Sequence, residues 1–584
     1  MKTVEVKING QPVQANAGGS ILDAARLAGI RIPALCIHPD LQAWGACGIC
    51  IVKIEGNPRL VRACSTKVVA GQNYLTHDPE IQAIRRTVIE LILSNHPQEC
   101  LSCARNQACE LQKLAAEFSI RDIPYDMNIE NLPKDTSTEA VILDPSKCVA
   151  CGRCALVCQN LQDVWALEFL GRGEKTRMAP SADVLLDESP CIKCGQCSAH
   201  CPVGAIYEKD DTKQFLDAIL NKDLHVSVQI APAVRVALGE AFGMNAGEIV
   251  TGKIYAALRK LGVNSVFDTN FSADLTIMEE GSEFVERFVN KKGDLPQLTS
   301  CCPAWTDYME KYYPDMIPHF STAKSPMMMQ GAMTKTYFAQ QKNLDPKKIY
   351  SVAIMPCTAK KYEIRRSDDM NSSGCPDVDL VLTTRELGRL IKMSGIDFVN
   401  LQDEKADSPI GLYSGAGTIF GVTGGVMEAA LRTAYKLVTK EDLQKVEIAP
   451  VRGMDGVKKG VIDMKGTPVK VAVAHGMVNV KSILEEIRAA KKAGSPMPYD
   501  FIEVMACRGG CIAGGGQPYE TDDNLRAART VGIYKDDEKS AARCSHQNPE
   551  IIHIYEKFLD NKPCGDKAHK YLHTHYKSRP LYKK

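Results

Sequence analysis

The chain opens with alternating apolar and polar residues and changes to helical and buried-strand patterns further on. Residues 3–8 and 12–15 alternate like two strands, and residues 20–29 have the apolar spacing of a helix. Residues 81–118 also repeat apolar side chains at helical intervals. The pattern predicts a small mixed domain over residues 1–78, followed by a long helical segment.

From residue 225 onward, short apolar runs alternate with helical segments. The predicted pairs of strand and helix are 226–230 with 247–261, 350–355 with 384–393, and 469–474 with 480–490. Continuous short apolar runs are typical of strands buried on both faces, which favours an α/β architecture. Residues 516–584 have the pattern of helices and loops with a basic end, for which a solvated tail is the simpler interpretation.

Composition and charge narrow the class of protein. The 584 residues are 45% hydrophobic and 24% charged, as in ordinary globular proteins. Lys and Arg number 71 against 70 for Asp and Glu, so the net charge of +1 argues against a nucleic-acid-binding protein. No apolar run approaches the roughly 18 residues of a membrane span, and the first residues do not resemble a signal peptide. We therefore expect a cytoplasmic protein.

Cysteine is the unusual residue of this sequence. Fifteen of the 23 cysteines lie from Cys36 to Cys201, and residues 202–300 contain none. Clustered cysteines in a long chain from a reducing compartment bind metal more often than they form disulfides. The first third of the chain is therefore predicted to be dense in metal centres.

Two similar cysteine runs follow each other between residues 148 and 202. The second has the bacterial ferredoxin spacing C-x2-C-x2-C-x3-C-P, and the first lacks only the proline. In such pairs the fourth cysteine of each run binds the cluster of the other run. Zinc is the alternative, although zinc sites usually pair two C-x2-C units. The predicted ligands are Cys148, Cys151, Cys154 and Cys201 for one [4Fe–4S] cluster, and Cys191, Cys194, Cys197 and Cys158 for the second.

Two further ligand sets precede these runs. The first set has a tight C-x2-C loop in the β-rich first domain, so it predicts a [2Fe–2S] cluster rather than zinc. The gap between its first two cysteines is longer than in plant-type ferredoxins. The second has only three cysteines, too few for a [4Fe–4S] cluster, so a histidine is predicted as fourth ligand; the alternative is that this histidine only caps a helix. The sets are Cys36, Cys47, Cys50 and Cys64, and then His96, Cys100, Cys103 and Cys109.

Three later segments, 299–305, 355–361 and 503–518, hold most of the remaining chemistry. Together they supply five cysteines, several glycines and lysines. Four of the cysteines could bind a further cluster: Cys302, Cys357, Cys507 and Cys511. The glycine-rich stretch 414–421 lacks the spacing of a nucleotide-binding loop, so it is interpreted as close packing near the site.

These three segments resemble the signature motifs of the iron–iron hydrogenases, and the N-terminal motifs match the larger members of that family. The layout is most similar to catalytic subunits of cytosolic multisubunit NADP-reducing hydrogenases, and it is also similar to single-chain clostridial enzymes. The resemblance implies reversible oxidation of H2 to protons and electrons at an H-cluster. This cofactor consists of a [4Fe–4S] cluster and a two-iron subsite that carries CO, CN and a bridging dithiolate amine.

The resemblance also implies a role for each matching residue. Cys302, Cys357, Cys507 and Cys511 would hold the [4Fe–4S] part, and Cys511 would bridge to the two irons. The remaining matches are Lys360 as donor to a cyanide, Met355 and Met505 as packing around the irons, and Cys301 as the thiol that passes protons to the amine. The proton path would continue through Glu280, Ser321 and Glu283. From the sequence alone, a solvated glutamate pair on a helix would be the simpler interpretation.

The expected fold is multidomain α/β and α+β. The expected domains are a β-grasp [2Fe–2S] ferredoxin-like domain (1–78), a His/Cys [4Fe–4S] domain (79–138), a two-cluster bacterial ferredoxin-like domain (139–210), an α/β H-cluster catalytic domain (211–515) and a small-subunit-like extension (516–584). This layout implies one [2Fe–2S] cluster, three accessory [4Fe–4S] clusters and the H-cluster.

The motifs are compatible with more than one electron partner. The resemblance favours flavin- and NAD(P)-binding and [2Fe–2S] partner subunits, and the first alternative is a single-chain enzyme that uses ferredoxin. A second alternative is a non-catalytic, hydrogenase-like iron–sulfur protein for sensing or assembly. A third is an electron-transfer subunit of a respiratory-type dehydrogenase, but it would leave the three later segments without a purpose.

Overall fold

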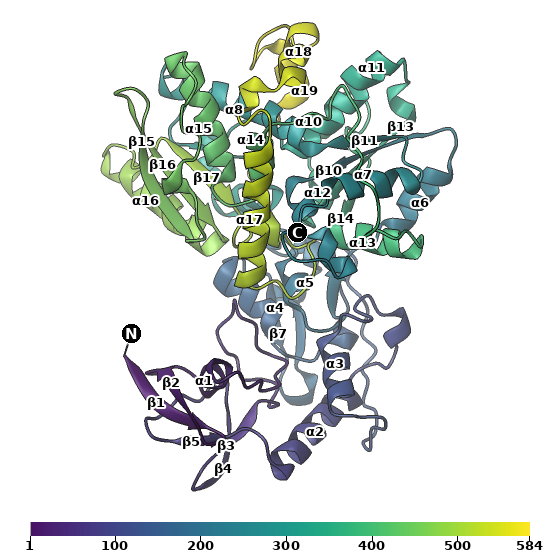
Figure 1. Cartoon of the computed structure of the whole chain (residues 1–584), viewed down its shortest axis with the longest axis vertical. Helices are drawn as coiled ribbons and strands as arrows, with labels where there is room; N and C mark the ends of the chain where they lie inside the picture. The colour runs from purple at the N-terminus through teal and green to yellow at the C-terminus, as the bar shows by residue number, and fades with distance from the viewer. Residues whose placement is uncertain (1, 584) are drawn as a thin grey trace.

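The structure is a computed structural model, and it describes residues 2–583. The first domain is a mixed five-stranded sheet of order β2-β1-β5-β3-β4, which lies at one end of the long axis (Figure 1). Helix α1 (Ile21–Leu27) begins at Ser20, whose side chain and that of Asp23 form a capping box. The strands are β1 (Thr3–Ile8), β2 (Gln11–Asn16), β3 (Ile51–Ile54), β4 (Asn57–Arg62) and β5 (Asn73–Leu75).

The predicted helical segment 81–118 is wrong in its middle. The structure has helix α2 (Pro79–Ser94) and helix α3 (Glu110–Glu117), with an irregular loop and one short turn between them. Pro97 lacks the backbone N–H that a continuing helix needs, which is consistent with the break. The loop instead carries the histidine and the three cysteines of the second ligand set.

Two short helices with the same local design follow in the ferredoxin-like region (139–210). Helix α4 (Arg153–Leu156) and helix α5 (Gln196–His200) each begin after a glycine in the left-handed region, Gly152 (φ 79°) and Gly195 (φ 71°). Each helix lies within one of the two cysteine runs. Two antiparallel pairs flank them: β6 (Val141–Leu143) with β9 (Ile206–Glu208), and β7 (Leu167–Leu170) with β8 (Arg177–Pro180).

The rest of the chain contains two four-stranded sheets, ordered β11-β10-β13-β14 and β12-β17-β16-β15. All strand pairs in these sheets are parallel except β15 with β16. This largely parallel pairing confirms the α/β architecture with buried strands that the apolar runs predict. The first sheet consists of β10 (His225–Ile230), β11 (Ser265–Asp268), β13 (Ile349–Met355) and β14 (Leu380–Thr383), and the second of β12 (Gln297–Leu298), β15 (Val457–Asp463), β16 (Pro468–His475) and β17 (Phe501–Met505).

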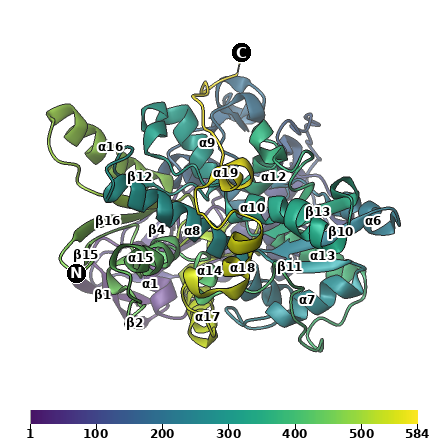
Figure 2. The same cartoon turned by 90° about the horizontal axis from the view of Figure 1, so that it is seen from above.

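Helices separate and cover these two sheets. Helices α8 (Thr269–Phe288), α10 (Pro326–Met333) and α14 (Gly415–Ile419) lie between them (Figure 2). In α14, a Cβ on Gly417 would lie 2.4 Å from the Asn270 backbone oxygen, so the glycine-rich stretch is close packing. The other helices are α6 (Thr212–Leu220), α7 (Thr251–Lys260), α9 (Pro303–Tyr312), α11 (Ala339–Lys342), α12 (Ala359–Glu363), α13 (Thr384–Met393), α15 (Gly425–Thr439) and α16 (Met477–Ala493). No helix in residues 2–583 is both long and apolar enough to span a membrane.

The C-terminal segment is not the solvated tail that its polarity favours. After α17 (Asp523–Lys539), α18 (Pro549–Lys557) and α19 (Asp566–Leu572), it crosses residues 211–515, the expected catalytic region, and reaches the ferredoxin-like region. The Arg579 guanidinium pairs with Asp307, and the Lys583 ammonium pairs with Asp187. Both carboxylates lie more than 200 residues away in the sequence, so a local sequence pattern cannot reveal these pairs.

Buried ion pairs join the ferredoxin-like region to the catalytic region. The Arg385 guanidinium of α13 donates to Glu208 of β9 at 2.7 Å, and both side chains are about 95% buried or more. The Arg389 guanidinium of the same helix pairs with the other carboxylate oxygen of Glu208 at 2.8 Å. These charges stabilise the junction only as pairs, because an unpaired buried charge is costly.

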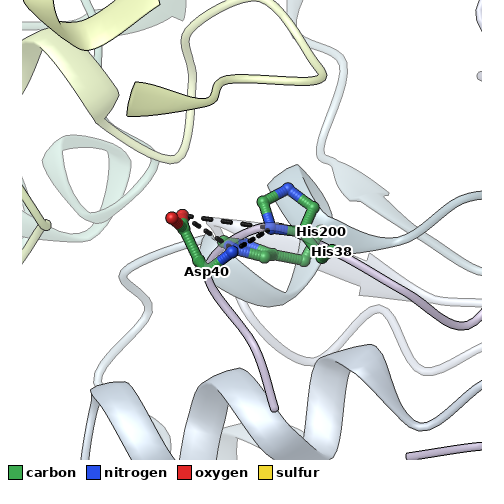
Figure 3. Close-up of side chains that lie close together, drawn as sticks. All are labelled: His38, Asp40 and His200. Carbon is green, nitrogen blue, oxygen red and sulfur yellow. Dashed lines mark hydrogen bonds and ion pairs between the residues drawn. The ribbon is translucent and has the colours of Figure 1, made fainter. Parts of the chain in front are cut away.

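A second buried junction holds the first domain (Figure 3). The Asp40 carboxylate accepts hydrogen bonds from Arg508 and Arg526 and lies 3.6 Å from His200 Nε2. The ring of His38 lies 4.1 Å from that of His200. Desolvation and the nearby His200 lower the pKa of His38 to about 3. Four segments that are distant in sequence therefore meet at one carboxylate.

Candidate active site

The three cysteine-bearing segments of the catalytic region follow three parallel strands. Cys302 comes shortly after β12, Cys357 after β13 and Cys507 after β17. The carboxyl ends of parallel strands are the usual place for ligands in open α/β sheets. Met355 and Met505 are the last residues of their strands, so the backbone directs them to the same place. Segments distant in sequence thus converge between the two sheets.

The convergence encloses a cavity of about 80 Å³, several times the volume that one water needs. Met355, Met505, Phe420 and Met327 give it an apolar wall. All the residues that the hydrogenase resemblance places around the cofactor line it: Cys301, Cys302, Met355, Cys357, Lys360, Met505, Cys507 and Cys511.

The four candidate cluster ligands form one group of buried thiols. None of Cys302, Cys357, Cys507 and Cys511 is in a disulfide. Burial, and then the neighbouring thiols, raise the pKa of Cys511 to about 12 and that of Cys507 well above its usual value. Iron would replace these protons, because thiolates are the ligands of iron–sulfur clusters. The donor set therefore fits a four-iron cluster.

Backbone packing leaves no room for larger residues beside these thiols. Gly510 has a φ of 97°, and a Cβ there would lie 2.9 Å from Met505 Sδ. A Cβ on Gly514 would lie 2.2 Å from the Pro356 oxygen. Glycines therefore allow the third segment to approach the second closely, which holds Cys511 at the cavity wall.

Lys360 brings a fixed positive charge to the cavity. Its ammonium donates to Glu363 Oε2 at 2.6 Å and to the Cys301 backbone oxygen at 3.1 Å. Burial alone would lower the pKa of Lys360, but the Glu363 carboxylate outweighs it and the pKa is raised. The lysine thus stays charged in an otherwise apolar wall, where an anionic ligand would find a donor.

The predicted proton-path residues lie together. Desolvation, followed by the charge of Glu280, raises the pKa of Cys301. The Ser321 hydroxyl donates to Glu283 Oε2 at 2.7 Å, and Arg287 pairs with the other oxygen of Glu283 at 2.7 Å. The contacts of Ser321 and Arg287 hold the partly exposed Glu283, whereas Glu280 and Ser321 are buried, so a solvated glutamate pair does not describe these residues.

Glu280 is the central group of this line. Both carboxyl oxygens are buried without a hydrogen-bond partner among residues 2–583. Burial and the nearby Glu283 raise the pKa of Glu280 to about 8. A carboxyl group that is protonated near neutral pH can both give and take a proton.

The thiols of the first domain also meet at one place. Contacts with Cys47 and Cys64 lower the pKa of the Cys36 thiol, and contact with Cys64 lowers that of Cys50 to about 7. The Leu35 backbone N–H lies 3.5 Å from Cys47 Sγ. The structure thus brings all four predicted [2Fe–2S] ligands together.

His96 lies with its three predicted co-ligands around a cavity of about 250 Å³. Its ring is buried, and Nδ1 has no hydrogen-bond partner among the described residues. Burial and the Lys147 charge lower the pKa of His96 to about 4, so the imidazole is neutral, as a metal ligand must be. A helix-capping role would leave this nitrogen unexplained.

The two ferredoxin-type sets cross between the runs. Cys201 acts on the pKa of Cys148 and Cys151, whereas Cys191 acts on that of Cys158. The fourth thiol of each run therefore lies near the first thiols of the other run. Backbone N–H groups also approach the sulfurs, with Lys193 at 3.3 Å from Cys191 and Ala166 at 3.3 Å from Cys158.

Sequence reasoning missed two polar clusters around the catalytic region. One is the Asp40 junction. In the other, buried Glu279 accepts from Tyr555 and lies 3.0 Å from His573 Nε2, which also contradicts the solvated-tail interpretation for that histidine. Both clusters join residues hundreds of positions apart, so no local signal could reveal them.

Family models match nearly the whole chain. The model "Iron only hydrogenase large subunit, C-terminal domain" matches residues 224–515, and the iron hydrogenase small subunit matches 523–579. A 2Fe-2S iron-sulfur cluster binding domain matches 1–78, the NADH-ubiquinone oxidoreductase-G iron-sulfur binding region 85–124, and a 4Fe-4S dicluster domain 147–205. The chain belongs to the iron-only, or [FeFe], hydrogenase family.

Individual relatives agree with this assignment. The NADP-reducing hydrogenase subunit HndD of Solidesulfovibrio fructosivorans is 46% identical, over 99% of this chain and 100% of that protein. Iron hydrogenase 1 of Clostridium pasteurianum is 39% identical over the same shares. A solved structure, an apo variant of the [FeFe]-hydrogenase HydA1 from Chlamydomonas reinhardtii, has a TM-score of 0.56 and 41% identity, over 64% of this chain and 100% of that one.

Proposed function

We propose that this enzyme oxidises H2 reversibly to two protons and two electrons, and that the electrons travel through its iron–sulfur clusters to a flavin- and NAD(P)-binding partner. The observation that carries the proposal is the cavity where five thiols, one lysine and three methionines converge. A non-catalytic sensor or assembly protein would not need a complete set of these residues beside a proton path.

The proposed cofactors follow from the ligand groups. The first domain (1–78) would hold one [2Fe–2S] cluster, residues 79–138 one [4Fe–4S] cluster with His96, and residues 139–210 two more. The catalytic region, 211–515, would hold the H-cluster with Cys302, Cys357, Cys507 and Cys511 as ligands, and 516–584 would cover it. When bound, the H-cluster supplies the metal chemistry that splits H2.

The residues of the chain do the remaining work. Cys301 would exchange a proton with the bound cofactor, and Glu280 would exchange it with Cys301. Ser321 and Glu283 would carry it onward, and Arg287 holds the Glu283 carboxylate in place. Met355, Met505 and the other apolar residues would exclude water, and Lys360 would orient an anionic ligand of the cofactor.

The NADP link depends on the relatives rather than on a nucleotide site in this chain. HndD is described as a subunit of an NADP-reducing hydrogenase, and its similarity extends over the whole chain. Ferredoxin is the second candidate partner, as the resemblance to single-chain clostridial enzymes implies; iron hydrogenase 1 of Clostridium pasteurianum is similar over the same length.

The test is hydrogen oxidation by the anaerobically matured chain alone, with a viologen dye in one tube and NADP in another. We expect viologen reduction without NADP reduction. NADP reduction by the chain alone would contradict the need for a partner. No viologen reduction in a sample with carbonyl and cyanide infrared bands would contradict the catalytic function.

A further inference from the structure

Gln196 connects the ferredoxin-like region to the catalytic region. It is the first residue of α5, between Cys194 and Cys197, and its side chain is buried. Its Nε2 donates to Cys507 Sγ at 3.2 Å and to the Ala513 backbone oxygen at 3.0 Å. The two hydrogens of one amide nitrogen are thus shared between a sulfur and an oxygen of the catalytic region.

The same residue also acts on the other side of the junction. Its backbone N–H lies toward the Cys194 thiol. Its backbone oxygen lies 2.8 Å from His200 Nδ1, which fixes the turn. Gln196 therefore contacts a candidate ligand of an accessory cluster and a candidate ligand of the catalytic cluster.

The approach of the two regions is tight at this point. A Cβ on Gly515 would lie 2.3 Å from the Cys194 oxygen, and a Cβ on Gly195 would lie 2.2 Å from Thr358 Oγ1. Because the backbones touch through glycines, the Gln196 side chain has little freedom to leave Cys507. The hydrogen bond is thus held by the packing of both regions.

We propose that Gln196 raises the reduction potential of the cluster bound by Cys507 and matches it to the neighbouring cluster bound by Cys194 and Cys197. This inference rests on the proposed function, which makes these cysteines ligands. Reduction adds one electron and makes the cluster and its sulfurs more negative. An N–H donor stabilises that reduced form more than the oxidised form.

The step needs no chemistry beyond electron transfer. One electron leaves the neighbouring cluster and enters the cluster at Cys507, or the reverse during hydrogen oxidation, and no bond is made or broken. Gln196 touches no substrate, so it is a positioning residue that acts through the Cys507 sulfur. Gln196 therefore changes the reduction potential of the cluster at Cys507 and not the transfer of protons.

The test compares Gln196→Met with Gln517→Met in the fully matured chain. Methionine keeps the length of the side chain but has no N–H. Gln517 is also a buried glutamine, but it donates to the backbone oxygens of two residues that line the cavity, Ala233 at 2.9 Å and Cys511 at 3.5 Å, rather than to a sulfur. An anaerobic redox titration followed by the infrared carbonyl bands gives the midpoint potential of each variant.

We expect Gln196→Met to lower the reduction equilibrium constant about tenfold, which is about 59 mV for one electron. Gln517→Met should not shift it. Gln196→Glu, which also lacks the N–H, should lower the potential as well and serves if the methionine variant does not fold. An unchanged potential with intact bands, or an equal shift in Gln517→Met, would overturn the inference alone. A wild-type chain that shows neither bands nor turnover would overturn the proposed function with it.

Discussion

The accessory region and the catalytic region hold their thiols in opposite ways. In residues 1–210 the ligands of each candidate cluster come from one or two cysteine-containing stretches that lie close together in the sequence, and glycine turns such as Gly152 and Gly195 shape two of the loops. In the catalytic region the four thiols come from three segments at the ends of three strands. A site built from local loops can be predicted from the sequence. The catalytic site cannot be predicted from local spacing in this way, because the whole α/β framework brings its ligands together.

The largest expected effect on activity comes from substitution of Cys511, a proposed ligand of the catalytic cluster. Cys511→Ser should abolish hydrogen oxidation, because a serine is a poor ligand for the iron that would lie at the cavity wall. Viologen reduction and the infrared bands measure it. The matched variant is Cys544→Ser, a buried thiol outside the site, which should remain active. Full activity in Cys511→Ser would remove this residue from the ligand set.

Cys301→Ala should keep the iron content but lower turnover by about 100-fold or more, the usual range for loss of a positioned acid or base. The reason is that Cys301 lies against Glu280 and the cavity without being one of the four proposed ligands. Viologen reduction with metal analysis measures both quantities. A near-normal rate would show that protons take another route.

Glu280→Gln should lower turnover by a similar or smaller factor and change the pH dependence of stability. The folded pKa of Glu280 is about 8, above its usual value of 4.5, so the folded state holds the proton more tightly. Its contribution to stability is full below about pH 4.5 and is lost as the pH rises toward 8.

The corresponding measurement is chemical denaturation between pH 4 and pH 9. The wild-type protein should lose stability relative to Glu280→Gln over that window. Parallel curves would show that the carboxyl group is solvated.

Asp40→Asn tests how much the buried Asp40 junction contributes to the stability of the attachment between the first domain and the rest of the chain. It should lower the free energy of unfolding by about 3 kcal/mol, because Arg526 would keep a buried charge with a weaker partner. Viologen activity should be unchanged. The control is Glu404→Gln, whose partner Arg259 is partly exposed and which should cost less than about 1 kcal/mol. Equal losses in the two variants would contradict a special role for the junction.

The smallest expected effect belongs to His96→Cys. It should retain a four-iron cluster, because a fourth thiol can replace the imidazole, and it should shift the potential of that cluster downward. A redox titration by electron paramagnetic resonance measures the shift, with the wild-type chain as the control. If the potential does not move, His96 is not a ligand.

The contrast between the regions also explains what the sequence predicts. Cysteine spacing is a local property, so the accessory ligand sets and the α/β pattern can be derived from the chain alone. The break near Pro97 does have a local signal, because proline cannot continue a helix, but the apolar periodicity on both sides of the loop hides it. Gln196, Asp40 and Glu279 could not be predicted, since their partners lie far away in the sequence and depend on tertiary packing.

The buried pair of Arg385 and Glu208 has a practical consequence for protein engineering. The accessory region, residues 1–210, carries its own ligand sets, but removing it would leave the buried Arg385 without its partner Glu208. A minimal catalytic fragment of this chain would therefore need a neutral, well-packed substitute for Arg385 before it could be produced alone. The two regions have separate tasks, yet neither can be removed without changes to the interface between them.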